Sequence, residues 1–281
     1  MKIIECPRDA MQGLHDFIPT EWKAAYLNVL LQVGFDTLDF GSFVSPKAIP
    51  QMRDTAEVLE QLKLETTATK LLAIIANLRG AEQASSFGQI TYLGFPLSVS
   101  ETFQQRNTNK SIAEAWREIE QMQRLCQQHN KQLIVYLSMG FGNPYGDRYS
   151  PEIVVAQVAQ LAELGVSIVA PSDTVGNASP ESIDRLFRQL IAAFPAIEFG
   201  AHLHSIPHTV TEKIDAAYQA GCRRFDGAIK GFGGCPMATD ELTGNIPTEQ
   251  LIAILESKGL DLKLDKSTFE QAYHLADQVF K

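Results

Sequence analysis

Two histidines separated by one residue are the side chains in this sequence best suited to bind a metal. They lie in the apolar segment Gly200-Ala201-His202-Leu203-His204. Side chains alternate in direction along a strand, so His202 and His204 are expected to point to the same side. Two imidazoles so placed at a strand end make a good two-ligand clamp for a divalent metal. Chance placement of two nearby histidines is the alternative that the pattern alone leaves open.

Three other segments carry side chains that could act with this pair. Arg8 and Asp9 follow the first apolar run, with Gln12 shortly after; a glycine-rich segment from 230 to 236 carries Cys235; and Asn245 follows Gly244. Taken singly, each has a plainer interpretation: a surface ion pair for Arg8 and Asp9, a buried inert thiol for Cys235, and turn chemistry for Asn245. Together, one carboxylate, two imidazoles and one amide form a mixed oxygen and nitrogen set typical of a divalent metal site.

Short apolar runs alternate with longer amphipathic stretches from end to end, which predicts βαβ units and a parallel sheet. Strands are expected at residues 2–6, 37–43, 68–76, 89–96, 132–139, 167–171, 197–204 and 223–229. Helices are expected near 19–34, 52–62, from 78, at 111–130, 151–164, from 180, at 209–220, and after 247 and 267.

Eight such units favour an α/β fold of the closed (β/α)8 TIM barrel type over an open sheet. A length of 281 residues suits one barrel domain, residues 1–281, with an added C-terminal helical segment beyond Gly259. Active sites of these barrels lie at the C-terminal ends of the strands. The first, seventh and eighth strands are neighbours in a closed barrel, so the candidate residues are expected to converge there.

Composition excludes several other classes of function. A formal net charge of −9 makes nucleic acid an unlikely partner. No run of about 18 apolar residues occurs, so no membrane span is expected. The start of the chain is typical of a strand rather than a targeting signal. The four cysteines are widely spaced and form no CxxC pair, which favours a reducing cytoplasm.

The order and number of short motifs indicate a known family over nearly the whole chain. The sequence resembles the hydroxymethylglutaryl-CoA lyases of the DRE-TIM metallolyase group. The matching segments are 7–9 with Gln12, 18–21, 42–47, 50–52, 98–103, 143–146, 172–176, 202–204, 233–236 and 244–245.

This resemblance implies a metal-dependent retro-Claisen cleavage of 3-hydroxy-3-methylglutaryl-CoA into acetyl-CoA and acetoacetate. The implied metal is Mg²⁺ or Mn²⁺, bound by Asp9, the two histidines and Asn245. Arg8 is the implied cation beside the enolate oxygen, Asp39 its acidic neighbour, and Cys235 an acid on a mobile loop. The base that removes the substrate's hydroxyl proton is Asp9 or His202, and the sequence does not separate them.

Further expectations concern the substrate and the biological setting. Gln12, Ser100, Asn107 and Asp173 are expected to contact the acyl-CoA substrate, with helix capping or loop structure as the alternative for Asp173. Leucine degradation or ketone-body chemistry is implied by the family alone, and a homodimer is a further expectation. The nearest alternative function is a related acyl-CoA or 2-oxo-acid lyase or synthase on the same barrel. A non-catalytic barrel is disfavoured because all four expected ligands are present.

Several positions depart from the pattern of the family. The first strand is one residue shorter before Arg8, and Asp39 replaces a glutamate. Ser205 replaces an aspartate after His204, the segment 206–208 is atypical, and the segment between Cys235 and Asn245 is one residue longer. The departures leave the expected metal ligands intact. They bear on substrate identity and on the groups that orient the histidines.

Overall fold

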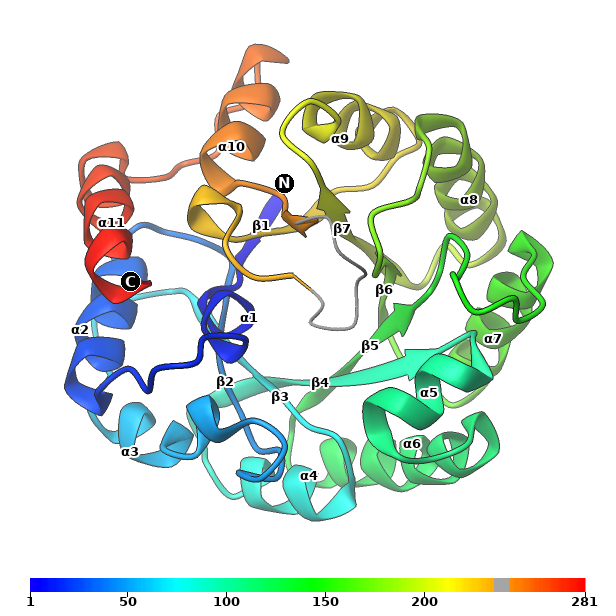
Figure 1. The fold of residues 1–281 in the computed structure, drawn as a ribbon, viewed down its shortest axis with the longest axis horizontal. Coiled ribbons are helices and arrows are strands. Elements are labelled where there is room, and N and C mark those ends of the chain that lie inside the picture. Colours follow the sequence, from blue (N-terminus) through cyan, green and yellow to red (C-terminus); the bar gives the residue numbers. More distant parts are fainter. Residues whose placement is uncertain (235–242, 281) are drawn as a thin grey trace.

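Eight parallel strands close into a barrel surrounded by helices, which confirms the predicted TIM barrel (Figure 1). The computed structural model describes residues 1–234 and 243–280. Each strand pairs with the next, and β8 pairs with β1 to complete the ring. The strands are β1 Lys2–Glu5, β2 Thr37–Ser42, β3 Lys70–Ile74, β4 Ile90–Ser98, β5 Gln132–Ser138, β6 Ile168–Asp173, β7 Glu198–Ser205 and β8 Arg224–Gly227.

The helices begin where capping residues or prolines predict them. Ser111 and Glu114 form a capping box at the start of α6, and Ser179 caps α8 just before Pro180. The α-helices are α1 Pro7–Gln12, α2 Thr20–Leu30, α3 Thr55–Glu60, α4 Leu78–Ser85, α5 Glu101–Thr108, α6 Ile112–Gln128, α7 Pro151–Glu163, α8 Pro180–Ala193, α9 Val210–Gln219, α10 Thr248–Ser257 and α11 Lys266–Val279. Short 3-10 helices span Pro50–Met52 and Ile229–Gly231. In the described parts of the chain, no helix is both long and apolar enough to cross a membrane.

The core has two parts because both faces of the sheet are covered. The larger part lies between the strands and the outer helices and includes Leu93, Val135 and Phe187. A smaller cluster fills the inside of the barrel, and its members alternate along the strands with those of the larger part: Leu72, Tyr92, Ile134, Tyr136, Ile168 and Ala170. The inner face turns polar on β7 and β8, where the candidate site begins.

The added C-terminal helix, α11, packs beside α2 in the outer ring, as Figure 1 shows. The rings of Phe35 and Phe269 meet edge to face at 6.3 Å, and those of Tyr26 and Phe280 at 5.5 Å. The chain therefore places its last helix against its first long one, which confirms the predicted helical addition.

Three elements near the site were not predicted from the sequence. Arg8 and Asp9, expected at a strand end, lie instead in the short helix α1, which is inside the ring of outer helices in Figure 1. Pro7 at its first turn lacks the N–H that would continue β1, so the chain turns there into a helix. The helix α5 and the two-residue strand β9, Gly244–Asn245, were also not predicted. Elements this short carry too few residues to show a period.

Candidate active site

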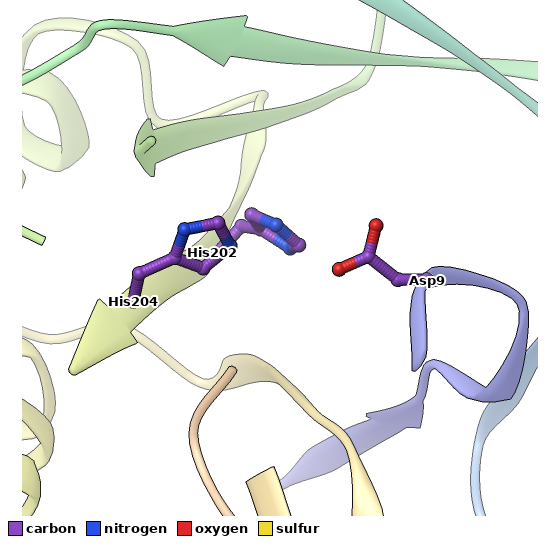
Figure 2. A group of neighbouring side chains, drawn as sticks. All are labelled: Asp9, His202 and His204. Carbon is purple, nitrogen blue, oxygen red and sulfur yellow. The ribbon is translucent and has the colours of Figure 1, made fainter. Parts of the chain in front are cut away.

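Asp9, His202 and His204 bring their ligand atoms together at the C-terminal end of the barrel. One ligand atom from each of the three lies within 4.8 Å of the others. Figure 2 shows the His202 ring facing the Asp9 carboxylate, with the His204 ring beside it. The carboxylate comes from α1 and both imidazoles from β7. The convergence expected from the two distant segments is thus present.

His204 has one ring nitrogen satisfied and one without a partner. Its Nδ1 lies 3.0 Å from the carbonyl oxygen of Thr174, so Nδ1 carries the hydrogen. Its Nε2 is buried and has no hydrogen-bond partner among residues 1–234 and 243–280. Burial and the neighbouring His202 lower the pKa of His204 to about 4, so the ring is neutral. A neutral imidazole with a buried, unpartnered lone pair is what a metal ligand requires.

His202 is oriented by a carboxylate that the sequence analysis did not single out. Its Nδ1 lies 3.0 Å from Oδ2 of Asp226, on β8. Burial alone would lower the pKa of His202, but the hydrogen bond and charge of Asp226 outweigh it and raise the pKa above its usual value. Asp226 is detectable in the sequence as the one acidic residue inside a predicted strand next to the histidine strand. Such a carboxylate behind a histidine is a common support for a metal ligand.

Asp9 is held as a carboxylate by the groups around it. Its Oδ1 accepts hydrogen bonds from Nη1 of Arg8 at 2.9 Å and Nε2 of Gln12 at 2.7 Å. Its Oδ2 accepts one from Nδ2 of Asn245 at 2.7 Å. Burial would raise the pKa of Asp9, but Arg8 and the two histidines hold it below its ordinary value. An ionised oxygen is therefore available beside the imidazoles.

Asn245 lies at the site, with its amide nitrogen rather than its oxygen turned towards Asp9. It is on β9, directly opposite His204 in an antiparallel pair. Its Nδ2 donates to Asp9 and also to the carbonyl oxygen of Phe232 at 2.9 Å. An amide that binds a cation does so through its oxygen. To act as a ligand beside Asp9, the Asn245 amide must turn over.

Arg8 is fixed by a two-pronged ion pair with Asp39. The Nε of Arg8 lies 3.2 Å and 3.0 Å from the two carboxylate oxygens, and Nη2 lies 2.5 Å from Oδ2. Arg8 also donates to Gln12 at 2.9 Å. Burial raises the pKa of Asp39 to about 6, and the charge of Arg8 opposes that rise. The pair matches the arrangement expected of these residues and holds the guanidinium beside Asp9.

A cavity of about 610 Å³ opens onto these side chains. Arg8, Asp9, both histidines and Gln12 line it, as does Tyr136, whose ring meets His202 edge to face at 5.4 Å. The lining continues over the segments that follow β2 and β3 and the end of α5: Val44, Ser45, Ala48, Ile49, Ala76, Asn77, Arg106, Asn107, Thr108, Asn109 and Lys110. The volume is within the range of small-molecule sites.

The residues expected to contact substrate fall into two groups. Gln12 and Asn107 line the cavity, whereas Ser100 and Asp173 do not. Ser100 is fully buried and caps α5, where it accepts from the backbone N–H of Phe103 at 3.1 Å. Asp173 is buried in an ion pair with Lys213 at 2.7 Å. Both side chains therefore stabilise local structure and do not face the cavity. For Asp173 this agrees with the alternative named above, a role in loop structure. Cys235 lies outside the described residues.

Comparison with known proteins places these features in a family. A family model described as HMGL-like matches residues 2–276. A hydroxymethylglutaryl-CoA lyase of Bacillus subtilis is 34% identical over 262 residues, covering 92% of this chain and 87% of the relative. The crystal structure of a B. subtilis HMG-CoA lyase superposes with a TM-score of 0.92 at 32% identity, covering 99% and 93% of the chains. The structure of an HMG-CoA lyase of Acinetobacter baumannii in complex with coenzyme A and 3-methylmalate superposes with a TM-score of 0.91 at 29% identity. The match covers 100% of this chain and 91% of that chain.

Proposed function

Since the chain belongs to the HMGL-like family, we propose that it cleaves 3-hydroxy-3-methylglutaryl-CoA into acetyl-CoA and acetoacetate by a metal-dependent retro-Claisen reaction. The observation that carries this proposal is the meeting of Asp9, His202 and His204 within 4.8 Å, in a cavity that Arg8 also lines. That combination offers a place for a cation and, next to it, a fixed positive charge.

The residues present fit a divalent cation, which we propose is Mg²⁺ or Mn²⁺. The buried Nε2 of His204 has no partner in the described part of the chain, and Asp9 is held ionised. Asp9, His202 and His204 would hold the ion, and Asn245 would join them once its amide has turned. The ion supplies Lewis acidity, which lowers the pKa of a bound substrate hydroxyl.

Arg8 is positioned to stabilise the charge that develops on the thioester oxygen. A guanidinium has five N–H groups. Four of these are directed at Asp39, Asp9 and Gln12, which leaves one N–H of Nη2 without an acceptor among the described residues. When the bond between C2 and C3 breaks, its electron pair moves into the thioester enolate, whose oxygen can accept that N–H. Donors fixed in advance in this way are worth about 10²–10³ in rate.

The base that accepts the substrate's hydroxyl proton is Asp9 or His202, the two candidates from the sequence. The pKa of His202 is raised by Asp226, whereas the pKa of Asp9 is held below its usual value. His202 could take the proton only while its Nε2 is off the cation, because its Nδ1 faces Asp226. Asp9 keeps carboxylate oxygens for the same role, so both candidates stay open. Loss of the proton lets the C3 oxygen form the ketone of acetoacetate. We propose that Cys235 then protonates C2 of the enolate to give acetyl-CoA.

The far part of the cavity lining suits the CoA portion of the substrate. Arg106 and Lys110 both line the cavity, so a chain of net charge −9 offers two cationic side chains where phosphates would enter. The guanidinium of Arg106 lies 4.6 Å from the ring centroid of Tyr145, which holds it in place. The side chain of Lys110 pairs with Glu118. Asn107, between them, adds a neutral amide that we propose contacts substrate, as does Gln12.

The pathway, the cellular compartment and the assembly of the protein are also part of the proposal. We place the reaction in leucine degradation and in the cytoplasm, with the whole chain as one domain and a homodimer as its assembly. The family resemblance supports the pathway. The free thiols of Cys6, Cys126 and Cys222 suit a reducing compartment.

The direct test is incubation of the purified protein with 3-hydroxy-3-methylglutaryl-CoA and Mg²⁺ or Mn²⁺. We expect equal amounts of acetoacetate and acetyl-CoA, abolished by EDTA and restored by added metal. No acetoacetate under any of these conditions would overturn the proposal.

A further inference from the structure

Lys213, on α9, holds a buried ammonium group against the backbone of His204, one of the proposed metal ligands. The residue is 2% exposed. Its Nζ donates to Oδ2 of Asp173 at 2.7 Å, to the carbonyl oxygen of Gly176 at 2.9 Å and to the carbonyl oxygen of His204 at 2.8 Å. An ammonium has three N–H donors, so all of them are used. Neither the reaction scheme nor the family motifs assign this lysine a role.

The three acceptors lie on two segments that must keep a fixed distance. Asp173 and Gly176 flank Thr174, whose carbonyl oxygen accepts the hydrogen bond from Nδ1 of His204. The third acceptor is the backbone of His204 itself. The Lys213 ammonium therefore links His204, which donates the hydrogen bond, to the loop around Thr174, which accepts it.

Thr174 is fixed from its other side as well. Its Oγ1 accepts from the backbone N–H of Met139 at 2.8 Å, and the N–H of Gly176 closes a turn onto the carbonyl oxygen of Asp173 at 3.1 Å. Pairing of Asp173 with Leu203 brings the start of the loop beside β7, and beyond that pair Lys213 adds a direct contact between the loop and the backbone of His204. A metal-bound histidine depends on the partner of its other nitrogen for ring orientation and tautomer.

We propose that Lys213 is a positioning residue that sets the distance between Thr174 and His204, and so keeps Nε2 of His204 aimed at the cation. The inference rests on the proposed metal site. It also gives Asp173 a function: its carboxylate lies in the same contact and neutralises an ammonium that would be costly to bury alone.

A purely structural role for Lys213 makes a different prediction. Lys131 provides a matched comparison, because it is also buried and donates to backbone carbonyl oxygens, those of Phe87 at 2.7 Å and Ile90 at 2.6 Å. It touches none of the residues that form the metal site. Loss of either lysine should lower thermal stability, but only loss of Lys213 should change how the protein binds metal.

The experiment measures Mn²⁺ binding by electron paramagnetic resonance on the full chain, well below the melting temperature of each variant. The variants are Lys213→Met, the charge-neutral pair Lys213→Met with Asp173→Asn, Lys131→Met and His204→Ala. The double variant leaves no unpaired buried carboxylate, so it should fold even where the single variant does not. Nitrogen-15 spectra of the imidazoles report the tautomer of His204 in the metal-free protein.

We expect the double variant to bind Mn²⁺ about tenfold or more weakly and to lose the single Nδ1–H tautomer of His204, while Lys131→Met binds as the wild type does. Unchanged Mn²⁺ affinity and an unchanged tautomer in the double variant would overturn the inference, provided that His204→Ala weakens binding. If His204→Ala binds as tightly as the wild type, the proposed metal site is itself wrong, and the inference is overturned with it.

Discussion

Nδ1 of His202 lies 3.0 Å from Oδ2 of Asp226, inside the barrel and one strand away. This pair leaves Nε2 of His202 facing Asp9, as Figure 2 shows for the ring and the carboxylate. The carboxylate raises the pKa of His202 against the effect of burial. Orientation and basicity of the imidazole therefore depend on one side chain that is not itself among the proposed ligands of the cation.

Asp226→Asn should weaken Mn²⁺ binding about 10- to 100-fold, because the amide keeps the shape of the side chain but removes its charge. The measurement is an Mn²⁺ titration of wild type and variant. Asp54→Asn is the control, since Asp54 is also buried and pairs with Lys23, 2.7 Å away. Equal losses in the two variants would show that the effect is general destabilisation.

Arg8→Lys should reduce kcat about 10²–10³-fold and change KM little. Lysine keeps the charge but cannot form the two-pronged contact with Asp39 and still present an N–H to the enolate oxygen. Steady-state kinetics with 3-hydroxy-3-methylglutaryl-CoA provide the test. A variant with kcat within a few-fold of wild type would contradict the role given to the guanidinium.

The pair Arg106→Gln and Lys110→Gln should raise KM for the CoA substrate about tenfold or more with little change in kcat, since the two charges are proposed to bind phosphates far from the breaking bond. The increase should shrink as ionic strength rises. Lys47→Gln is the matched control, because Lys47 is exposed and does not line the cavity. A larger increase in KM from Lys47→Gln than from the double variant would contradict the proposed position of the phosphates.

Glu5 predicts a pH dependence of stability that is separate from catalysis. Burial raises the pKa of Glu5 to about 8, although hydrogen bonds from Thr248 and from the backbone N–H of Ile229 oppose the rise. A folded-state pKa above the ordinary value of 4.5 means that the protonated form favours folding. Its contribution is complete below pH 4.5 and is lost as pH rises to about 8.

Glu5→Gln mimics the protonated side chain: its Oε1 can accept from the backbone N–H of Ile229, and its Nε2 can donate to Oγ1 of Thr248. The free energy of unfolding of the variant, relative to that of wild type, should increase from pH 5 to pH 9 by an amount on the order of a few kcal/mol. Urea unfolding of both proteins at the two pH values measures the gain. A difference in stability that stays constant from pH 5 to pH 9 would contradict the raised pKa.

Much of the fold followed from the sequence because the barrel strands are uniform and their boundaries are marked. Ile197–His204 is predicted as a strand and is observed as Glu198–Ser205, so the shared direction of the two histidines follows from alternation. Helix starts such as Pro151 and Pro180 were correct because proline at the first turn has a defined conformation.

Other parts of the site depend on packing between distant segments. The contact of Asp226 with His202 requires the register of β7 and β8, which no local pattern contains. For Asp173 the sequence leaves substrate contact and loop structure both open, and its ion pair with Lys213, forty positions away, favours the second. The direction of the Asn245 amide is set by Phe232 and Asp9, from two further segments.

The central claim is that Asp9, His202 and His204 bind one divalent cation. Anomalous diffraction from crystals grown with Mn²⁺ tests it directly. We expect a single strong peak about 2.0–2.3 Å from a carboxylate oxygen of Asp9 and from Nε2 of both histidines. A peak elsewhere, or none between these three side chains at saturating Mn²⁺, would contradict it.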